Sequence, residues 1–343
     1  MMTLKGLILP GGCAEPSDGA LQRVANRPVV GHVLAELAGA GVGEVLVALP
    51  GEELRRCVEE QRPPGLRVSH LSWTEGDLSR SLAGAAEAVG GAACVVHAGD
   101  GLLAQPLAPL AALLGGDSPD LVTLVHRPPS GAASIGLATR RLLRMAGSRE
   151  EGPVEVAGVF LLGPGALREA GGAVRWCGER GLDLVPLAER LAEAGGAIRV
   201  ERVRGWRQAG GSTAELLELN RMALDALCPP EAQATEGNRI EGNVEVHATA
   251  CVQSSTIVGP AIVGAGALVL DSYIGPYTSI GAGARVEGAE VERSIVLEGA
   301  SITHIGGRLV ASVVGREARI YRDFSLPRAL RVTVGDGDEV ALC

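Results

Sequence analysis

Aromatic residues make up only 2% of the 343 residues, although 46% of the chain is hydrophobic. The cores must therefore be built from Val, Leu, Ile and Ala side chains. Long runs of positive charge are also missing, and the formal net charge is −9. This balance argues against nucleic acid or an anionic membrane surface as a partner, because both attract clustered cations.

The seven cysteines include no Cys-x-x-Cys pair and no metal-ligand spacing. Several lie in apolar runs, such as Cys94 in Ala-Ala-Cys-Val-Val, which predicts buried free thiols in a reducing compartment. The apolar stretch at residues 7–9 is too short for the core of a signal peptide. No window of the chain is apolar enough for a membrane span. We therefore expect a cytoplasmic protein.

The first two thirds of the chain alternate short apolar strands with helical patterns. Residues 7–9, 45–49 and 93–98 are continuous apolar strands, residues 29–41 have helical apolar spacing, and residues 52–61 predict a polar helix. Apolar strands between helices are typical of a parallel sheet that is covered on both faces. The sequence predicts a mainly parallel, Rossmann-like α/β domain over residues 1–228, followed by a linker at 229–239.

The last third has an internal repeat. Aliphatic residues fall at 240, 246 and 252, then at 257, 263 and 269, then at 274, 280 and 286, so the unit recurs every 17 residues. Such a repeat predicts three short faces per coil, with each inward aliphatic side chain stacked on its copy one coil below. We predict a left-handed parallel β-helix of hexapeptide repeats over residues 240–343.

Two loops could carry chemistry. Gly11 and Gly12 follow the first strand and could cradle a phosphate with backbone N–H groups, but residues 11–19 contain no Lys or Arg, so a plain turn is an alternative. Asp100 follows the strand 93–98 and could bind a magnesium ion or belong to a Gly-Asp-Gly turn. Cys13 is interpreted as a structural thiol rather than a nucleophile, because no base is adjacent in sequence. We expect His97 to be a core residue. We expect His304 to lie on the surface at the edge of a coil rather than to act as a catalytic base.

Long motifs are similar to those of one enzyme family. They are Lys5–Gly12 (KGLILPGG), Val24–Pro28 (VANRP), Ser81–Ala85 (SLAGA), His97–Leu103 (HAGDGLL), Gly158–Leu162 (GVFLL), Glu215–Arg221 (ELLELNR), Asp271–Gly281 (DSYIGPYTSIG) and Ser294–Gly299 (SIVLEG). Over nearly its whole length the chain resembles the long form of bacterial glucose-1-phosphate thymidylyltransferase, a type often found in antibiotic-sugar gene clusters.

The resemblance implies a reaction and a site. The family joins a nucleoside triphosphate to a sugar 1-phosphate and releases pyrophosphate. The matched positions imply nucleotide contacts and sugar contacts, with Mg²⁺ held by Asp100. The implied nucleotide-binding residues are Leu9, Gly11, Gly12, Gly99 and Asp100, and the implied substrate-binding residues are Gly136, Gly158 and Val159.

The chain departs from the family pattern where the charges should lie. Its first loop is shorter and lacks the family's Thr-Arg and Pro-Lys pairs, while Glu15 and Asp18 add negative charge. Gln208 stands where the family has its second metal-binding aspartate. Residues 145–148 and 182–185 lack the family's sugar-side lysine and glutamate. Because the reaction needs cations on the triphosphate and carboxylates on the metal, these losses together predict that the ordinary reaction is abolished.

Three hypotheses follow. The first is a catalytically silent homologue that acts as a partner or assembly subunit of an active paralogue in a secondary-metabolite sugar pathway, with the β-helix as contact surface. The second is an active transferase with an altered substrate, in which Arg23, Arg27 or another basic residue turns into the site. The third is a sensor that binds a sugar nucleotide without turning it over. We also expect a homo-oligomer. The sequence does not assign a catalytic residue.

Overall fold

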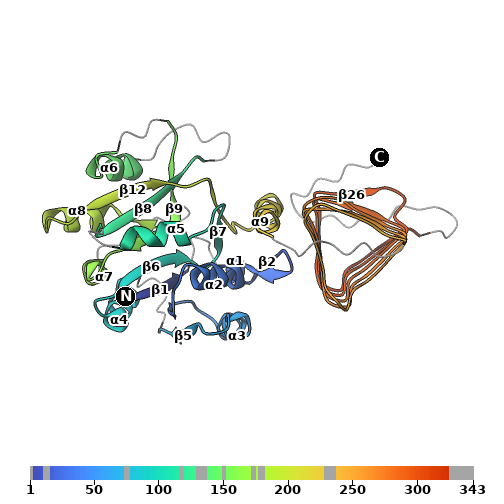
Figure 1. Ribbon diagram of the computed structural model, residues 1–343, viewed down its shortest axis with the longest axis horizontal. Helices are drawn as coiled ribbons and strands as arrows, with labels where there is room; N and C mark the ends of the chain where they lie inside the picture. The colour runs from blue at the N-terminus through green and yellow to red at the C-terminus, as the bar shows by residue number, and fades with distance from the viewer. Residues whose placement is uncertain are drawn as a thin grey trace.

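The computed structural model describes residues 3–10, 16–72, 78–115, 119–128, 137–148, 152–170, 175–176, 182–227 and 237–323. They form an α/β domain and a three-sided β-helix that lie side by side, with the helix α9 (Thr213–Asp225) between them (Figure 1). The predicted fold class is confirmed for both parts. The predicted boundaries at 228 and 240 remain a prediction, because most of the linker lies outside the described residues.

A seven-stranded mixed sheet forms the centre of the α/β domain. Its order is β12 (Ile198–Arg202), β8 (Leu121–His126), β9 (Glu155–Leu162), β6 (Ala93–Ala98), β1 (Leu4–Leu9), β4 (Glu44–Val47) and β5 (Arg67–His70). Strand β9 runs antiparallel to both of its neighbours, and the other pairs are parallel. The mainly parallel sheet of the prediction therefore contains one reversed strand.

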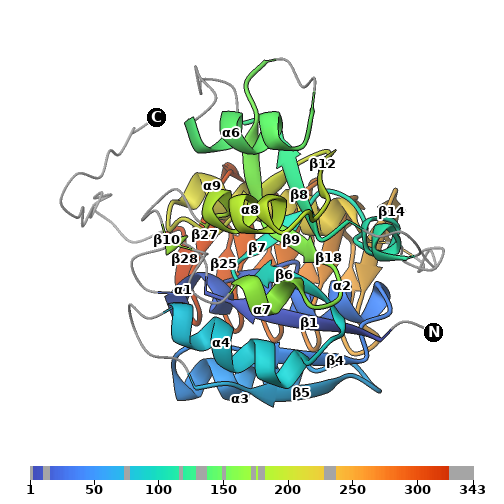
Figure 2. The same cartoon turned by 90° about the vertical axis from the view of Figure 1, so that its left-hand side faces the viewer.

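Two layers of helices cover the two faces of this sheet. Leu7 and Leu9 face a core that includes α4 (Leu78–Val89), α7 (Ala166–Ala170) and α8 (Val185–Glu193), the face seen in Figure 2. Ile8, between them in the strand, faces the opposite core with α2 (Val29–Gly39), α3 (Glu52–Gln61) and α5 (Ala108–Ala111). This alternation follows from the period of two in a strand.

Short elements complete the domain. They are α1 (Pro16–Leu21), β2 (Arg23–Val24), β3 (Arg27–Pro28), β7 (Gly101–Leu103), η1 (Ala112–Leu114), α6 (Leu137–Met145), β10 (Arg175–Trp176), β11 (Leu182–Asp183) and β13 (Trp206–Gln208). Cys94 is fully buried, and this burial raises the pKa of its thiol to about 12, as expected for an inert core cysteine. Cys57 and Cys251 are free and half-buried. Among the described helices, none is long and apolar enough to cross a membrane.

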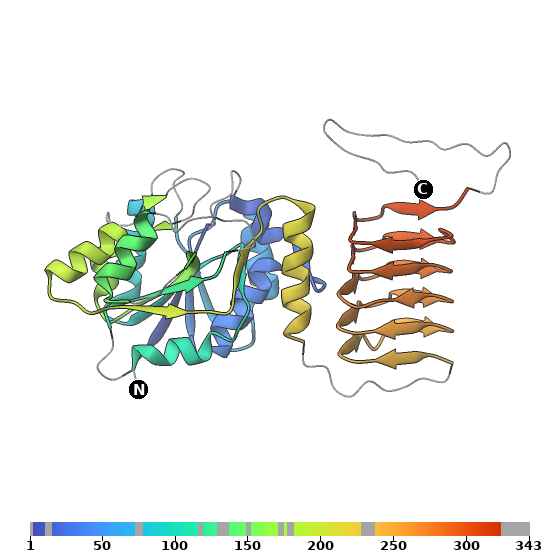
Figure 3. The ribbon, with the colours of Figure 1, turned by 90° about the horizontal axis from the view of Figure 1, so that it is seen from above.

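The β-helix consists of three parallel five-stranded sheets stacked as coils (Figure 3). The first holds β14 (Arg239–Glu241), β17 (Thr256–Val258), β20 (Tyr273–Ile274), β23 (Glu290–Glu292) and β26 (Arg308–Val310). The second holds β15 (Val244–Val246), β18 (Ala261–Val263), β21 (Thr278–Ile280), β24 (Ile295–Val296) and β27 (Val313–Val314). The third holds β16 (Cys251–Gln253), β19 (Leu268–Leu270), β22 (Arg285–Glu287), β25 (Ser301–Thr303) and β28 (Arg319–Tyr321).

The predicted inward rows are the ones that stack. Ile257, Ile274 and Val291 pair in register from coil to coil, and all three are 0% exposed. The same holds for the rows through Ile280 and Val286, which belong to the same buried cluster. Each side chain thus covers the one below it, which is how a repeat of short strands builds a continuous core.

Candidate functional site

The carboxyl ends of β1 and β6 form the edge of the sheet where a nucleotide would bind in this fold class. Leu9 pairs with Ala98, and the Gly99 N–H donates to the Leu9 carbonyl at 2.9 Å. The two loops of the prediction therefore start side by side. The Leu9 side chain is fully buried, so only its main chain can face a ligand. Gly11, Gly12, Cys13, Glu15 and Gly136 lie outside the described residues, as does the side chain of Asp18.

Asp100 is fully buried at this edge, directly beside Gln208. The strands β7 and β13 pair antiparallel with Gly101 opposite Gln208, and this pairing brings the two side chains together. Gln208 Nε2 donates a hydrogen bond to Asp100 Oδ2 at 3.1 Å. The Ala209 N–H also donates to the Asp100 main-chain carbonyl at 2.8 Å. The structure thus joins the two positions that the resemblance assigns to the metal.

These two side chains do not fit a magnesium ion held by paired carboxylates. Mg²⁺ needs oxygen ligands, and here an amide N–H points at a carboxylate oxygen that would otherwise bind the ion. Among the residues that the structure describes, no group of three or more His, Cys, Asp and Glu could hold a metal. Asp100 therefore has a neutral hydrogen-bond donor as its neighbour in place of a second anionic ligand.

The helix after the first loop packs directly on this pair. A Cβ atom on Gly19 of α1 would lie 3.0 Å from Asp100 Cβ and 3.1 Å from the Ala209 carbonyl oxygen. Both distances are shorter than ordinary van der Waals contact, so a larger residue would require the neighbours to shift by a few tenths of an ångström. In the predicted loop 11–19 a glycine is ordinary, so no signal in the sequence marks Gly19 as a packing position.

One of the predicted sugar-side residues, Gly158, lies against the Trp206 ring. A Cβ atom on Gly158 or on Gly101 would overlap the Trp206 ring, so both glycines make room for the indole. Val159 is 0% exposed and lies in the core, which leaves its main chain as the part that could reach a substrate. Their assignment as substrate contacts stays a prediction.

His97 and His304 both occupy structural positions, as predicted. His97 is fully buried, packs edge-on against Trp206 at 5.4 Å between ring centroids, and lies 3.6 Å from Glu36 through Nε2 and Oε2. The prediction of a core residue is confirmed. His304 is 57% exposed at a corner of the β-helix, with Nε2 3.8 Å from Glu287 Oε1, so the prediction of a coil-edge residue is also confirmed.

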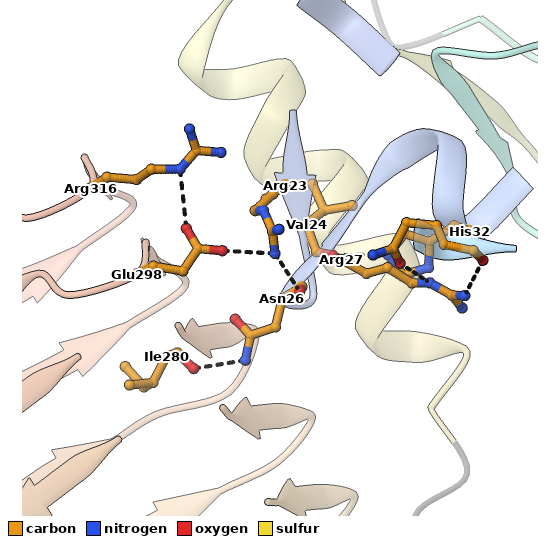
Figure 4. Close-up of polar contacts among 9 residues, drawn as sticks. Arg23, Val24, Asn26, Arg27, His32, Ile280, Glu298 and Arg316 are labelled. Carbon is orange, nitrogen blue, oxygen red and sulfur yellow. Dashed lines mark hydrogen bonds and ion pairs between the residues drawn. The ribbon is translucent and has the colours of Figure 1, made fainter. Parts of the chain in front are cut away.

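Arg23 and Arg27 are engaged away from Asp100. Arg23 Nη1 donates to the Asn26 carbonyl at 3.1 Å and pairs with Glu298 Oε1 of the β-helix at 2.7 Å (Figure 4). Arg27 Nε donates to Gln61 Oε1 at 3.1 Å, and burial lowers the pKa of its guanidinium. The second hypothesis, in which Arg23, Arg27 or another basic residue turns into the site, therefore gains no support from these two arginines.

A separate cavity of about 500 Å³ lies on the β-helix, lined by Asp271, Tyr273, Glu290 and Arg308 among others. Arg308 pairs with Glu290 at 2.9 Å and stacks over the Tyr273 ring at 5.0 Å. None of its lining residues belongs to the edge around Asp100, so this cavity is not part of the candidate site.

The comparisons with known proteins concern the chain as a whole. No family model matches the chain. A glucose-1-phosphate thymidylyltransferase of Streptomyces griseus is 29% identical over 352 residues, covering 97% of this chain and 98% of that protein. One from Streptomyces antibioticus is 29% identical over 358 residues, covering 99% of each chain. The low-salt glycan biosynthesis nucleotidyltransferase of Haloferax volcanii is 27% identical over 364 residues, covering 99% of this chain and all of that protein (100%).

A crystal structure assigned to glucose-1-phosphate thymidylyltransferase of Bacillus anthracis has a TM-score of 0.51 and 17% identity. It covers 66% of this chain and 98% of that one, and supports the fold alone. Over nearly its full length the chain is therefore similar to nucleotidyltransferases that include glucose-1-phosphate thymidylyltransferases. It is a homologue of glucose-1-phosphate thymidylyltransferase at 29% identity.

Proposed function

We propose that this homologue has lost ordinary nucleotidyl transfer and acts as a partner or assembly subunit of an active enzyme. The hydrogen bond between Gln208 and Asp100 carries the proposal. Two carboxylates at these positions would repel each other and attract a divalent cation. Here Gln208 gives Asp100 one hydrogen bond from a neutral amide at 3.1 Å, so the position lacks the second negative charge that would help to hold a divalent cation.

The scarcity of Lys and Arg residues where the triphosphate would lie supports the same proposal. Residues 11–19 contain no Lys or Arg, and the next two arginines, Arg23 and Arg27, bond to Glu298 and Gln61. Removing a single group that stabilises transition-state charge typically costs about 10²–10³ in kcat. The combined loss of the cations and of one metal ligand should therefore reduce the rate below detection.

The β-helix offers the surface for such a partner. Its second sheet packs against the α/β domain, and the outer faces of the other two sheets carry exposed charged residues such as Arg239, Arg285 and Arg319. We propose that these faces bind an active paralogue, or further copies of this chain, in the cytoplasm. A secondary-metabolite sugar pathway is the setting that the long-form resemblance supports.

Calorimetric titration with dTTP, with and without Mg²⁺, tests the role of Gln208. We expect the wild-type protein to show no strengthening by Mg²⁺, because one carboxylate and one amide donor do not form the ion's site. The variant Gln208→Asp should gain Mg²⁺-dependent nucleotide binding, because it restores the second carboxylate beside Asp100.

The matched control is Gln253→Asp, which adds the same charge in the β-helix. Mg²⁺ should leave this variant like the wild type. Wild-type binding that Mg²⁺ already strengthens as much as it does in Gln208→Asp would contradict the proposal and favour an active transferase. Tight binding of dTTP that ignores Mg²⁺ would instead favour a sugar-nucleotide sensor.

A further inference from the structure

One short segment reaches from the candidate site to the β-helix. It runs through α1 and the hairpin β2–β3, from residue 16 to residue 28. At its first end Gly19 packs on Asp100 and Ala209. At its other end Asn26 touches the β-helix, only seven residues further along the chain.

The tip of the hairpin is held by side chains and main chain of both domains (Figure 4). Ala25 and Asn26 have φ of 44° and 60°, in the left-handed region that costs energy for residues other than glycine. Asn26 Nδ2 donates to the Ile280 carbonyl of β21 at 2.7 Å. A Cβ atom on Gly264 would lie 3.1 Å from Asn26 Nδ2, so a glycine in the neighbouring coil leaves room for this side chain.

Asn220 of α9 joins three elements with one amide group. It is 0% exposed, and its Oδ1 accepts from the Ala25 N–H at 2.8 Å and from Ser279 Oγ at 2.6 Å. Its Nδ2 donates to the Tyr277 carbonyl at 3.1 Å. A buried amide with both ends bonded specifies one arrangement of its partners, because breaking it leaves polar groups without water.

Apolar packing surrounds this amide. The outward row of the second β-helix sheet reads Ile262, Ser279, Ile295 and Val313 in register. Its three aliphatic members pack against the core of the α/β domain, and its one polar member, Ser279, bonds Asn220. The outward row of this sheet is therefore buried against the α/β domain instead of facing water.

We infer that the β-helix is a structural part of the Asp100 site, and that Asn220 is the positioning residue that couples them. Asn220 fixes the hairpin tip on the β-helix, the tip fixes the segment 16–28, and Gly19 in that segment packs on Asp100 and Ala209. This inference goes beyond the proposed function, because it holds whether or not the site binds a nucleotide. It means that a partner seated on the β-helix can alter the Asp100 site.

Hydrogen exchange of the full-length protein tests the coupling through Asn220→Ala. We expect exchange to rise about tenfold or more in residues 16–22 and at the Ala209 amide, which donates to the Asp100 carbonyl. The matched control is Asn238→Ala. Asn238 also bridges main-chain groups, from the Val252 carbonyl to the Ser255 N–H, within the β-helix. Exchange at residues 16–22 and 206–210 should stay at the wild-type rate in that control.

A second variant covers the case in which Asn220→Ala does not fold. Ser279→Ala removes only the hydroxyl that bonds Asn220, and should raise exchange in the same two segments by a smaller factor. The inference is overturned if either folded variant loosens only α9 and residues 277–281, with residues 16–22 and 206–210 unchanged. It is equally overturned if Asn238→Ala loosens those segments as much as Asn220→Ala does.

Discussion

The β-helix and the sheet edge around Asp100 in the α/β domain differ in the constraints that their residues meet. In the β-helix, Ile257, Ile274 and Val291 repeat one packing solution coil after coil. At the Asp100 edge, Asp100 and Gln208 lie where the motif resemblance places the metal ligands, and they bond to each other. The comparison teaches that packing constraints and chemical constraints are separable: the stacked rows need only the right shape and apolarity, whereas the Asp100 edge depends on the identity of single polar side chains.

The largest effect is expected from a substitution in the stacked inward row of the β-helix. Ile274→Ala should lower the free energy of unfolding by about 3–4 kcal/mol, because it leaves a cavity between two buried aliphatic neighbours. Chemical denaturation would measure the loss. Thr256→Ala, an outward and half-buried position one coil below, is the control and should change the free energy of unfolding by less than about 0.5 kcal/mol. Equal losses would show that the inward row does not carry the stability of the β-helix.

The next largest effect is expected from acid, which should destabilise the protein through His32 of the α/β domain. Burial lowers the pKa of His32 in α2 to about 4, and its Nε2 lies 2.9 Å from the Val24 carbonyl of the hairpin. Since the unfolded chain takes up this proton near pH 6.5 and the folded chain only near pH 4, stability is lost as the pH falls between these values. The loss should reach about 2 kcal/mol at pH 4.5.

Chemical denaturation from pH 7 to pH 4.5 measures this slope. His32→Gln keeps a hydrogen-bond donor without the titrating ring, and should flatten the profile. The exposed His247 of the β-helix offers the control, because His247→Gln should have the same pH profile as the wild type. A profile that His32→Gln does not change would show that other groups cause the acid sensitivity.

The smallest effect compares two glycines in helices. Gly19→Ala would place a Cβ atom against Asp100 and Ala209, and should destabilise the protein by about 1–2 kcal/mol. Gly84→Ala, in α4 with no atom within 4 Å of the new Cβ, should stabilise it by about 0.5–1 kcal/mol. Thermal unfolding of both variants measures the difference in sign. A stabilising Gly19→Ala would mean that α1 does not rest on the Asp100 pair.

Much of the fold followed from local pattern. The polar helix expected at 52–61 is α3 (Glu52–Gln61), and the aliphatic rows beginning at 240 are the inward rows of the β-helix. Both depend on periodicity, which neighbouring residues in the sequence impose. The reversal of β9 was not predicted, because an apolar strand buried on both faces has the same composition in either direction.

Only part of the candidate site could be predicted from the sequence. The pairing of Asp100 with Gln208 was implied by motif resemblance, while their direct hydrogen bond depends on the register of β7 and β13. The destinations of Arg23 and Asn220 were not predicted, since their partners lie in another domain, 275 positions away for Arg23–Glu298 and 59 for Asn220–Ser279. Contacts of this kind leave no periodic signal in a single sequence.

The most direct test of the central claim is pyrophosphate release by the purified wild-type protein, with dTTP, glucose 1-phosphate and Mg²⁺ at saturating concentrations. The same assay is run with the other nucleoside triphosphates and on the Asp100→Asn variant. We predict no release above that of the Asp100→Asn variant with any nucleotide. Steady release that disappears in Asp100→Asn would contradict the account, because it would mean that Asp100 supports catalysis beside Gln208.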